Sequence, residues 1–221
     1  MSSPPQNRSA IADQTLGADR ELALIHVPAK VREAIRALFA IDAAMADVVA
    51  KSSDPALGRI KLAWWRERLE ELDQGHPPAE PRLQKAAAEL RPRGLTGRDL
   101  AQLEAGWATL LDADPDPKLV ASRGSALFAL GGQLLGTGDS MLGDAGALYA
   151  LSSVGRRGLP QFLAAAPPYL ARIRGHRFAK GVRPLTMLAK AATRDLNVAE
   201  PEGSRGRALA MLVHRWSGRI G

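Results

Sequence analysis

Two carboxylates in the stretch of residues 37–50, ALFAIDAAMADVVA, could take part in metal chemistry: Asp42 and Asp47. Mg²⁺ prefers oxygen ligands and usually combines one or two carboxylates with the phosphates of a substrate. Ligands four positions apart on a helix share one face, but Ala46 and Ala50 stand four and eight positions after Asp42. Asp47 is turned by about 100° from Ala46 around the helix. A lone carboxylate on this face is a poor substitute for a paired metal site.

Other catalytic chemistries find little support in the residues. The chain has no cysteine, which excludes thiol catalysis and thiolate metal sites. No G-x-S-x-G nucleophile elbow is present. The glycine-rich stretch of residues 131–139, GGQLLGTGD, lacks a Walker lysine and a preceding strand, and indicates either close helix packing or room for a ligand. The histidines are dispersed, without a partner at metal-ligand spacing: His26, His76, His176 and His214.

The elements that must position these residues are helices. Hydrophobic residues make up 46% of the chain, mostly Ala and Leu, and aromatic residues only 5%. Apolar residues recur at three- and four-residue steps, and no strand-like alternation persists. The sequence predicts an all-α fold, with a flexible arm over residues 1–17 and one helical domain over residues 18–221. The first helix is expected over residues 19–52, with a break near Pro28, and the second begins at Asp54 and Pro55. Further helices are expected over 81–91, 97–112, 117–136, 140–153, 160–173, 183–193 and 204–216.

The predicted second helix follows Asp54 and Pro55, and its inner face is assigned from the spacing of its apolar residues. Trp64 is placed in the core by its distance from the apolar residues before it, and Trp65 is left open as core or groove. Trp216 ends a basic amphipathic helix and is expected at an interface. The main apolar positions of the second helix are Leu57, Ile60, Trp64, Leu69 and Leu72.

The positive charge of the chain is concentrated in its last third. Residues 1–149 hold 17 Lys or Arg and 20 Asp or Glu, whereas residues 150–221 hold 13 basic and 3 acidic residues. Such asymmetry indicates an anionic partner, either an acidic protein or an anionic membrane surface, with a merely solvated face as the alternative. No nucleic-acid-binding motif supports a nucleic-acid partner. The expected partner-binding residues are Arg156, Arg157, Arg172, Arg174, Arg177, Lys180 and Arg183.

No segment approaches the ~20 uninterrupted apolar residues of a membrane span, and the first residues have no apolar signal-peptide core. These features predict a cytoplasmic protein, with the basic region available for peripheral contact with a membrane.

Three segments together resemble the squalene/phytoene synthase family. They are VREAIRALFAIDAAMADVVA (31–50), LGRIKLAWWRERLEEL (57–72) with GHP behind it, and GLTGRDLAQLEAGWATLLD (94–112). The resemblance spans roughly residues 20–136, about half of the chain. It implies an isoprenoid-synthase fold, in which about eight to ten helices surround a central cavity for a prenyl chain.

The resemblance also implies which positions would meet the substrate. Family enzymes hold Mg²⁺ with aspartates four positions apart on the first cavity helix, and here those positions carry Ala46 and Ala50. Phe39 stands in the place of a usual tyrosine, and Asp47 matches the second acid of the family's Asp-Asp pair. The second aspartate motif is expected on a later helix, but residues 145–194 contain no Asp or Glu.

Two hypotheses follow from the resemblance. The first is a non-catalytic family member that acts through protein or membrane contacts and needs no cofactor; a respiratory complex I assembly factor in the same family is the precedent. The second is an atypical prenyltransferase that condenses isoprenoid diphosphates and binds Mg²⁺ through Asp42, Asp47 or other acids. In both, Phe39, Asp42 and Asp47 are the expected substrate-side residues, and an isoprenoid could occupy the cavity.

Overall fold

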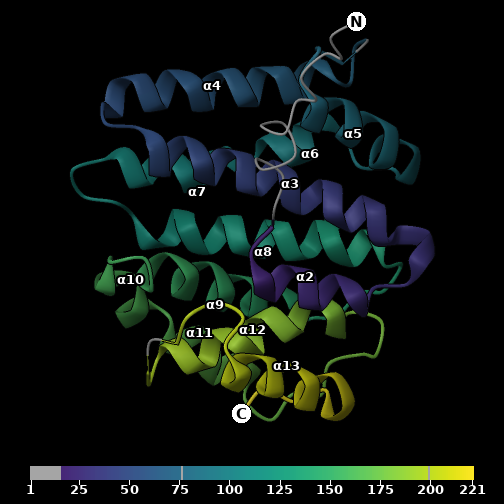
Figure 1. Ribbon diagram of the computed structural model, residues 1–221, viewed down its shortest axis with the longest axis vertical. Coiled ribbons are helices and arrows are strands. Elements are labelled where there is room, and N and C mark those ends of the chain that lie inside the picture. Colours follow the sequence, from purple (N-terminus) through teal and green to yellow (C-terminus); the bar gives the residue numbers. More distant parts are fainter. Residues whose placement is uncertain (1–15, 76, 199) are drawn as a thin grey trace, which may run out of the picture.

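The computed structural model describes residues 16–75, 77–198 and 200–221, and every regular element within them is helical (Figure 1). The all-α prediction is confirmed. Two short 3₁₀ turns, η1 (Arg91–Arg93) and η2 (Thr109–Leu111), join the α-helices. The α-helices are α2 (Ala18–Ile25), α3 (Ala29–Lys51), α4 (Pro55–Glu71), α5 (Pro81–Glu89), α6 (Gly97–Ala101), α7 (Glu104–Ala108), α8 (Pro117–Leu134), α9 (Leu142–Gly155), α10 (Pro160–Ala165), α11 (Pro167–Ile173), α12 (Arg183–Asp195) and α13 (Arg205–Ser217).

The predicted arm lies mostly outside the described residues, which begin at Leu16. Leu16 is buried in the core, and Gly17 is the N-cap of α2. These last two residues of the predicted arm therefore belong to the folded domain.

Several helices begin at a polar residue whose side chain accepts a hydrogen bond from an N–H group of the first turn. Asp54 accepts a hydrogen bond from the N–H of Ala56 and opens α4, as predicted. Asp116 caps α8 in the same way, and Thr96 forms a capping box with Asp99 at α6. Each such cap is worth about 1 kcal/mol. The predicted helix over residues 97–112 is broken into α6, α7 and η2, and that over 160–173 divides at the two prolines that open α11.

The helices are stacked along the long axis of the molecule (Figure 1). Helix α4 forms one end and α13 the other, with α3 and α8 crossing the middle. None of the helices in the described ranges is both long and apolar enough to cross a membrane.

The centre of the stack depends on a close approach of α8 and α9. A Cβ atom built on Gly124 would lie 2.2 Å from the carbonyl oxygen of Gly146, and one on Gly146 would lie 2.1 Å from the carbonyl oxygen of Gly124. Any larger residue at either position would force the two helices apart. The space beside Gly131 is also occupied, because a Cβ at this position would lie 2.7 Å from the side chain of Leu185. Within the glycine-rich stretch, close packing therefore holds for Gly131 and for Gly132, whose Cβ would lie 2.7 Å from Leu142. A Cβ on Gly136 or Gly138 would meet nothing within 4 Å, and this later part of the stretch lines a hollow of about 420 Å³.

The prediction for the inner face of α4 was right for Leu69 and Leu72 but wrong for its other three residues. Trp64 is 41% exposed, and Leu57 and Ile60 are also exposed, whereas Trp65 is buried at 7%. Both sets of residues have helical spacing, so periodicity alone could not choose between them. The inner stripe is selected by α6 and α7: a Cβ on Gly97, the first residue of α6, would lie 1.8 Å from the backbone oxygen of Leu69. The residues that turn inward are Leu62, Trp65, Leu69 and, just after the helix, Leu72.

Candidate functional site

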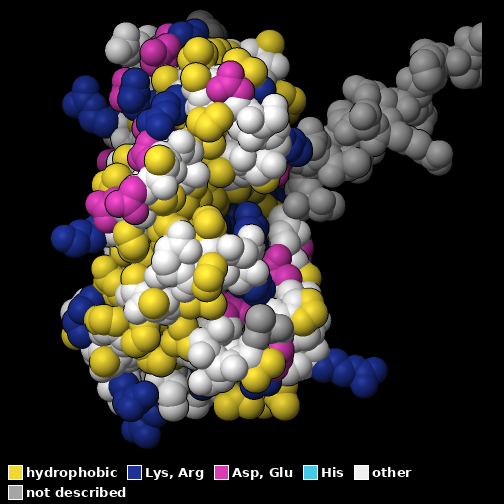
Figure 2. All heavy atoms as spheres, turned by 90° about the vertical axis from the view of Figure 1, so that its left-hand side faces the viewer, with side chains coloured by type: hydrophobic (Ala, Val, Ile, Leu, Met, Phe, Trp, Pro, Cys, Tyr) yellow, Lys and Arg dark blue, Asp and Glu magenta, His cyan; other side chains and the backbone are white. Residues whose placement is uncertain are grey.

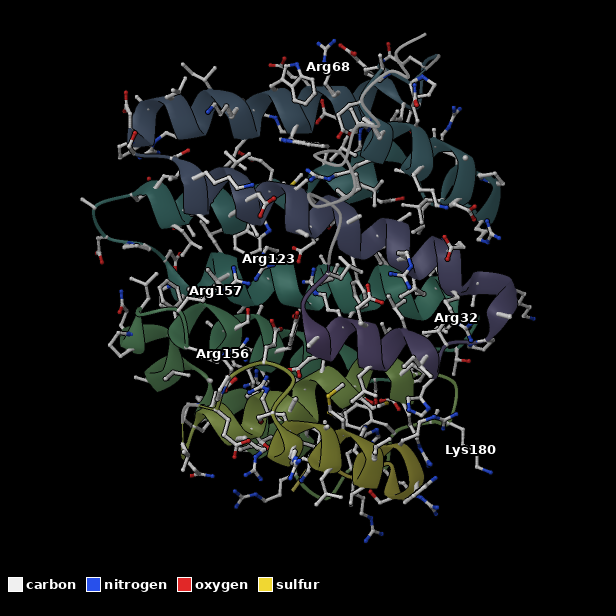
Figure 3. All side chains as sticks on the ribbon, viewed as in Figure 1. Arg32, Arg68, Arg123, Arg156, Arg157 and Lys180 are labelled. Atoms are coloured by element: carbon white, nitrogen blue, oxygen red, sulfur yellow. The ribbon has the colours of Figure 1, made fainter. Side chains whose placement is uncertain are left out.

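Asp42 lies on α3 at the centre of the molecule and is fully buried. One carboxylate oxygen, Oδ2, forms an ion pair with Arg20 of α2. The other, Oδ1, accepts a hydrogen bond from Nη1 of Arg123 at 2.6 Å and from Nε1 of Trp107 at 2.9 Å. Arg123 enters from α8, between the middle helices (Figure 3). Both oxygens of the carboxylate are therefore engaged by side chains from three other helices.

The two arginines are themselves held by aromatic residues. Arg20 donates from Nε to the hydroxyl of Tyr149 at 2.8 Å and from Nη1 to the backbone oxygen of Phe39 at 3.1 Å. Its guanidinium also lies 4.9 Å from the ring centroid of Phe39. The guanidinium of Arg123 lies 3.8 Å from the centroid of Trp107, a cation–π contact. This group of side chains, called the Asp42 network below, comprises Arg20, Phe39, Asp42, Trp107, Arg123 and Tyr149.

The Asp42 network keeps its carboxylate ionised although no water reaches it. Burial by itself would raise the pKa of Asp42, but the positive charges of Arg123 and Arg20 outweigh this effect and lower the pKa to about 2. The network holds two guanidinium ions against one carboxylate. Nε and Nη2 of Arg123 are buried without a hydrogen-bond partner, so the face of Trp107 is the group that faces this excess charge. Removing the carboxylate would leave two buried cations without an anion.

Mg²⁺ does not fit the residues at this site. Mg²⁺ needs oxygen ligands, yet both oxygens of Asp42 are bound by protein donors, and Ala46 and Ala50 contribute only methyl groups. Asp47 lies nearer the surface, where it pairs with Lys51 one helical turn away. Among the residues that the structure describes, no cluster of three or more His, Cys, Asp or Glu side chains could hold a metal ion.

Two hollows adjoin each other beside Ala46 and Ala50. The first has a volume of about 130 Å³ and is lined partly by Arg20, Asp42 and Asp47. The second, of about 220 Å³, is more apolar and is lined by residues such as Val49, Leu110 and Leu159. Both are smaller than the roughly 300–1,000 Å³ typical of ligand pockets. Figure 2 shows hydrophobic side chains gathered across the middle of the face on which α10 lies.

The structure brings two of the three expected substrate-side residues to this place. Asp42 and Asp47 both line the first hollow. Phe39 is buried in the core, where its ring lies under Arg20. The sequence interpretation missed Arg20 and Arg123 altogether. The available signal was an isolated arginine in an otherwise apolar helix, as in LVASRGSALFALGG, which favours a buried charge with a partner.

The predicted single basic surface is wrong for part of its residues. Arg183 is buried and donates to the backbone oxygens of Phe178 and Trp216, so it holds the end of α13 instead of facing solvent. Arg156 is half-buried and pairs with Glu202. Arg156 and Arg157 also lie apart from Lys180, toward the opposite side of the molecule (Figure 3).

The other members of the predicted surface lie on the outside. Arg172 is exposed but forms two hydrogen bonds to one oxygen of Asp144. Four of the seven residues are exposed to solvent and form no ion pair with an acid in the described ranges: Arg157, Arg174, Arg177 and Lys180.

Two of the four histidines, His176 and His214, form hydrogen bonds within the fold. His76 lies outside the described residues. His176 is hydrogen-bonded to Asp139 at 2.9 Å. His214 is fully buried on α13, where Nδ1 lies 2.9 Å from the backbone oxygen of Arg219 and Nε2 lies 2.8 Å from the hydroxyl of Thr186. The carbonyl oxygen can only accept, so Nδ1 carries a proton, and in the neutral ring Nε2 accepts from the hydroxyl of Thr186.

The buried ring of His214 predicts an acid-dependent loss of stability. Burial lowers the pKa of His214 to about 4, against 6.5 for an ordinary histidine. Because protons then bind the unfolded chain more tightly, the contribution of neutral His214 is complete above pH 6.5 and declines as the pH falls from 6.5 to 4. The loss is at most about 3 kcal/mol. The free energy of unfolding in urea, measured between pH 4 and 6.5, should therefore fall with decreasing pH. His214→Gln should remove this pH dependence and His176→Gln should retain it; an equal pH dependence in both variants would contradict the assignment.

The described residues form an all-α fold, which is consistent with the isoprenoid-synthase-like class. Residues 17–117, from the start of α2 to the start of α8, match the family model described as squalene/phytoene synthase. This match confirms the resemblance inferred from the sequence. No curated protein and no solved structure matches the chain.

Proposed function

We propose that this squalene/phytoene synthase-like protein does not ionise isoprenoid diphosphates and acts through contacts with proteins or membranes. The observation that carries the proposal is the state of Asp42. It is the buried carboxylate beside the positions that the resemblance assigns to metal ligands, and it is neutralised by Arg20 and Arg123. A carboxylate held in this way has no free oxygen for a metal ion.

The chemistry of the family explains why this matters. Departure of pyrophosphate from an allylic carbon places negative charge on the leaving group, which bound metal ions must balance. Ala46 and Ala50 offer no ligand there. The adjoining hollows are also small for a prenyl chain with its diphosphate. Under this proposal the protein needs no cofactor, and assembly of a respiratory complex is one form of contact function with precedent in the family.

The experiment is a pyrophosphate-release assay with farnesyl and geranylgeranyl diphosphate in the presence of Mg²⁺. We expect no release above the rate in protein-free buffer, for the wild-type chain and for Asp47→Ala alike. A cooperative thermal transition, followed by circular dichroism on the same sample, shows that the inactive protein is folded. Magnesium-dependent turnover that Asp47→Ala abolishes would instead establish the atypical prenyltransferase.

A further inference from the structure

Helix α13 exposes an apolar stripe at one end of the molecule. Leu209 is 64% exposed, Val213 48% and Trp216 78%, and their spacing of four and three residues places them on one face. The opposite face of α13 is buried, through Met211 and His214, against α12 and α2. Hydrophobic side chains are visible at this lower end of the molecule in Figure 2. The stripe is thus an exposed apolar face on a helix whose other face is anchored in the fold.

Cations surround the C-terminal end of the stripe. Arg177 and Arg219 face each other across an isolated backbone bridge, and Arg174 lies beside Gly221. The pKa of buried Arg183 is lowered by its burial and by the nearby charges of Arg177 and Arg215. Residues 203–221 contain no acid. Like charges gathered in this way repel one another, and an anionic surface brought against them would relieve the repulsion.

The acids that contact α13 and its N-cap, Asp19, Asp195 and Glu200, do so at residues 203–207, away from the C-terminal end of the stripe. Asp139, which contacts residues 176–179, does not neutralise the surface either. Asp139 accepts hydrogen bonds from His176 and from the backbone N–H of Ala179. Its side chain is only 5% exposed, so its charge acts inside the fold. Arg174, Arg177, Lys180 and Arg219 remain exposed around the end of α13.

We propose that α13 lies on an anionic lipid surface, with Leu209, Val213 and Trp216 in the interface and the surrounding arginines and lysine on the phosphates. A helix with an apolar face and basic residues beside it is the arrangement that binds in the plane of a bilayer interface. Tryptophan is enriched at the depth of the headgroups, where an amphipathic ring has both an apolar and a wet side.

The shape of the surface favours lipid over a protein partner. A protein partner has to supply a surface complementary to the side chains of this helix face, whereas lipid headgroups move aside for it. The charges also match, since each Lys or Arg near an anionic bilayer strengthens binding about five-fold. The inference deepens the proposed function by naming the surface and its partner. Failure of this inference can be told apart from failure of the proposed function, because vesicle binding is measured without any diphosphate substrate.

The test is co-sedimentation with vesicles of phosphatidylcholine and phosphatidylserine, compared with vesicles of phosphatidylcholine alone. The full chain is expected to bind the anionic vesicles, with an affinity that falls as salt is added. The variant L209S/V213S/W216S should bind at least ten-fold more weakly. Its matched control is L57S/I60S/W64S, which removes the same kinds of side chain from the exposed face of α4 at the opposite end, and should bind as the wild type does.

Charge is tested by a second pair of variants with the same substitutions. R174E/R177E/K180E should lose anionic-vesicle binding, whereas R91E/R98E/K118E, which reverses three exposed cations elsewhere, should lose little. When vesicles are added, the tryptophan fluorescence of the Trp64→Phe variant should shift to the blue, because Trp216 enters the interface. The Trp216→Phe variant should show no such shift. Equal binding to neutral vesicles, equal effects of the two apolar variants, or binding to an acidic protein without vesicle binding would overturn the proposal. Thermal transitions of all variants show that each remains folded.

Discussion

Replacing Asp42 by asparagine should lower the free energy of unfolding by about 3–5 kcal/mol, the largest loss that we expect from one isosteric change in this protein. The substitution keeps the volume of the side chain but removes the negative charge that Arg20 and Arg123 share. Two guanidinium ions would remain buried without an anion. Urea unfolding at neutral pH measures the loss directly.

The matched control is Asp47→Asn, the same substitution on the same helix. Asp47 pairs with Lys51 near the surface, where an ion pair contributes about 0–1 kcal/mol. The double variant Asp42→Asn/Arg123→Met should lose less stability than the sum of its single changes, because it removes one of the stranded cations together with the anion. Similar losses for Asp42→Asn and Asp47→Asn would show that the Asp42 network contributes nothing special to stability.

A comparable loss is expected when Arg207 of α13 is replaced by methionine. Arg207 is buried and lies between two carboxylates, donating to Asp19 at 2.7 Å and pairing with Asp195. The methionine would fill much of the space while leaving two buried carboxylates without their cation, at a cost of about 3–5 kcal/mol. Through these contacts Arg207 joins α2 and α12 to α13, so the variant loosens the end of the fold that carries the exposed stripe.

The pH dependence of this loss separates charge from packing. Burial already raises the pKa of Asp195 although Arg207 opposes the rise. Without Arg207 the pKa of Asp195 should rise further, so the folded variant takes up protons more readily than the unfolded chain. Its deficit relative to the wild type should therefore be greatest near neutral pH and shrink as the pH falls toward the ordinary range of a carboxyl group. A deficit that is constant with pH would indicate lost packing alone; Arg205→Met, at an exposed position on the same helix, serves as the control.

The helices could be predicted from the sequence because their signals are local. Asp54 and Pro55 begin α4 through one side-chain hydrogen bond and one fixed backbone angle, both of which depend on adjacent residues. The inward face of α4 could not be predicted in the same way. Leu57, Ile60 and Trp64 have the same spacing as the residues that are buried, and only the approach of α6 at Gly97 decides between the two faces.

The Asp42 network could not be predicted from the sequence either, because its contacts are not local. Its partners come from positions 22, 65 and 81 residues away in the chain, so no spacing rule brings them together. The same limit applies to the basic region: its net charge is a property of composition, but the burial of Arg183 depends on where α13 ends. Sequence analysis identified alanines at the positions that the resemblance assigns to metal ligands, and the structure revealed the arginines that neutralise Asp42.

The Asp42 network also has a consequence for how this protein can evolve. A single mutation that restores an acid at Ala46 would place it beside a hollow that Arg20 lines, where the new carboxylate would meet a guanidinium before a metal ion. Rebuilding a magnesium site therefore requires acids at Ala46 and Ala50 and the removal of at least one arginine. Removing the arginine first would strand the carboxylate of Asp42, and adding the acids first would give no activity. No single substitution, in either order, would therefore create a magnesium site at this place in the fold.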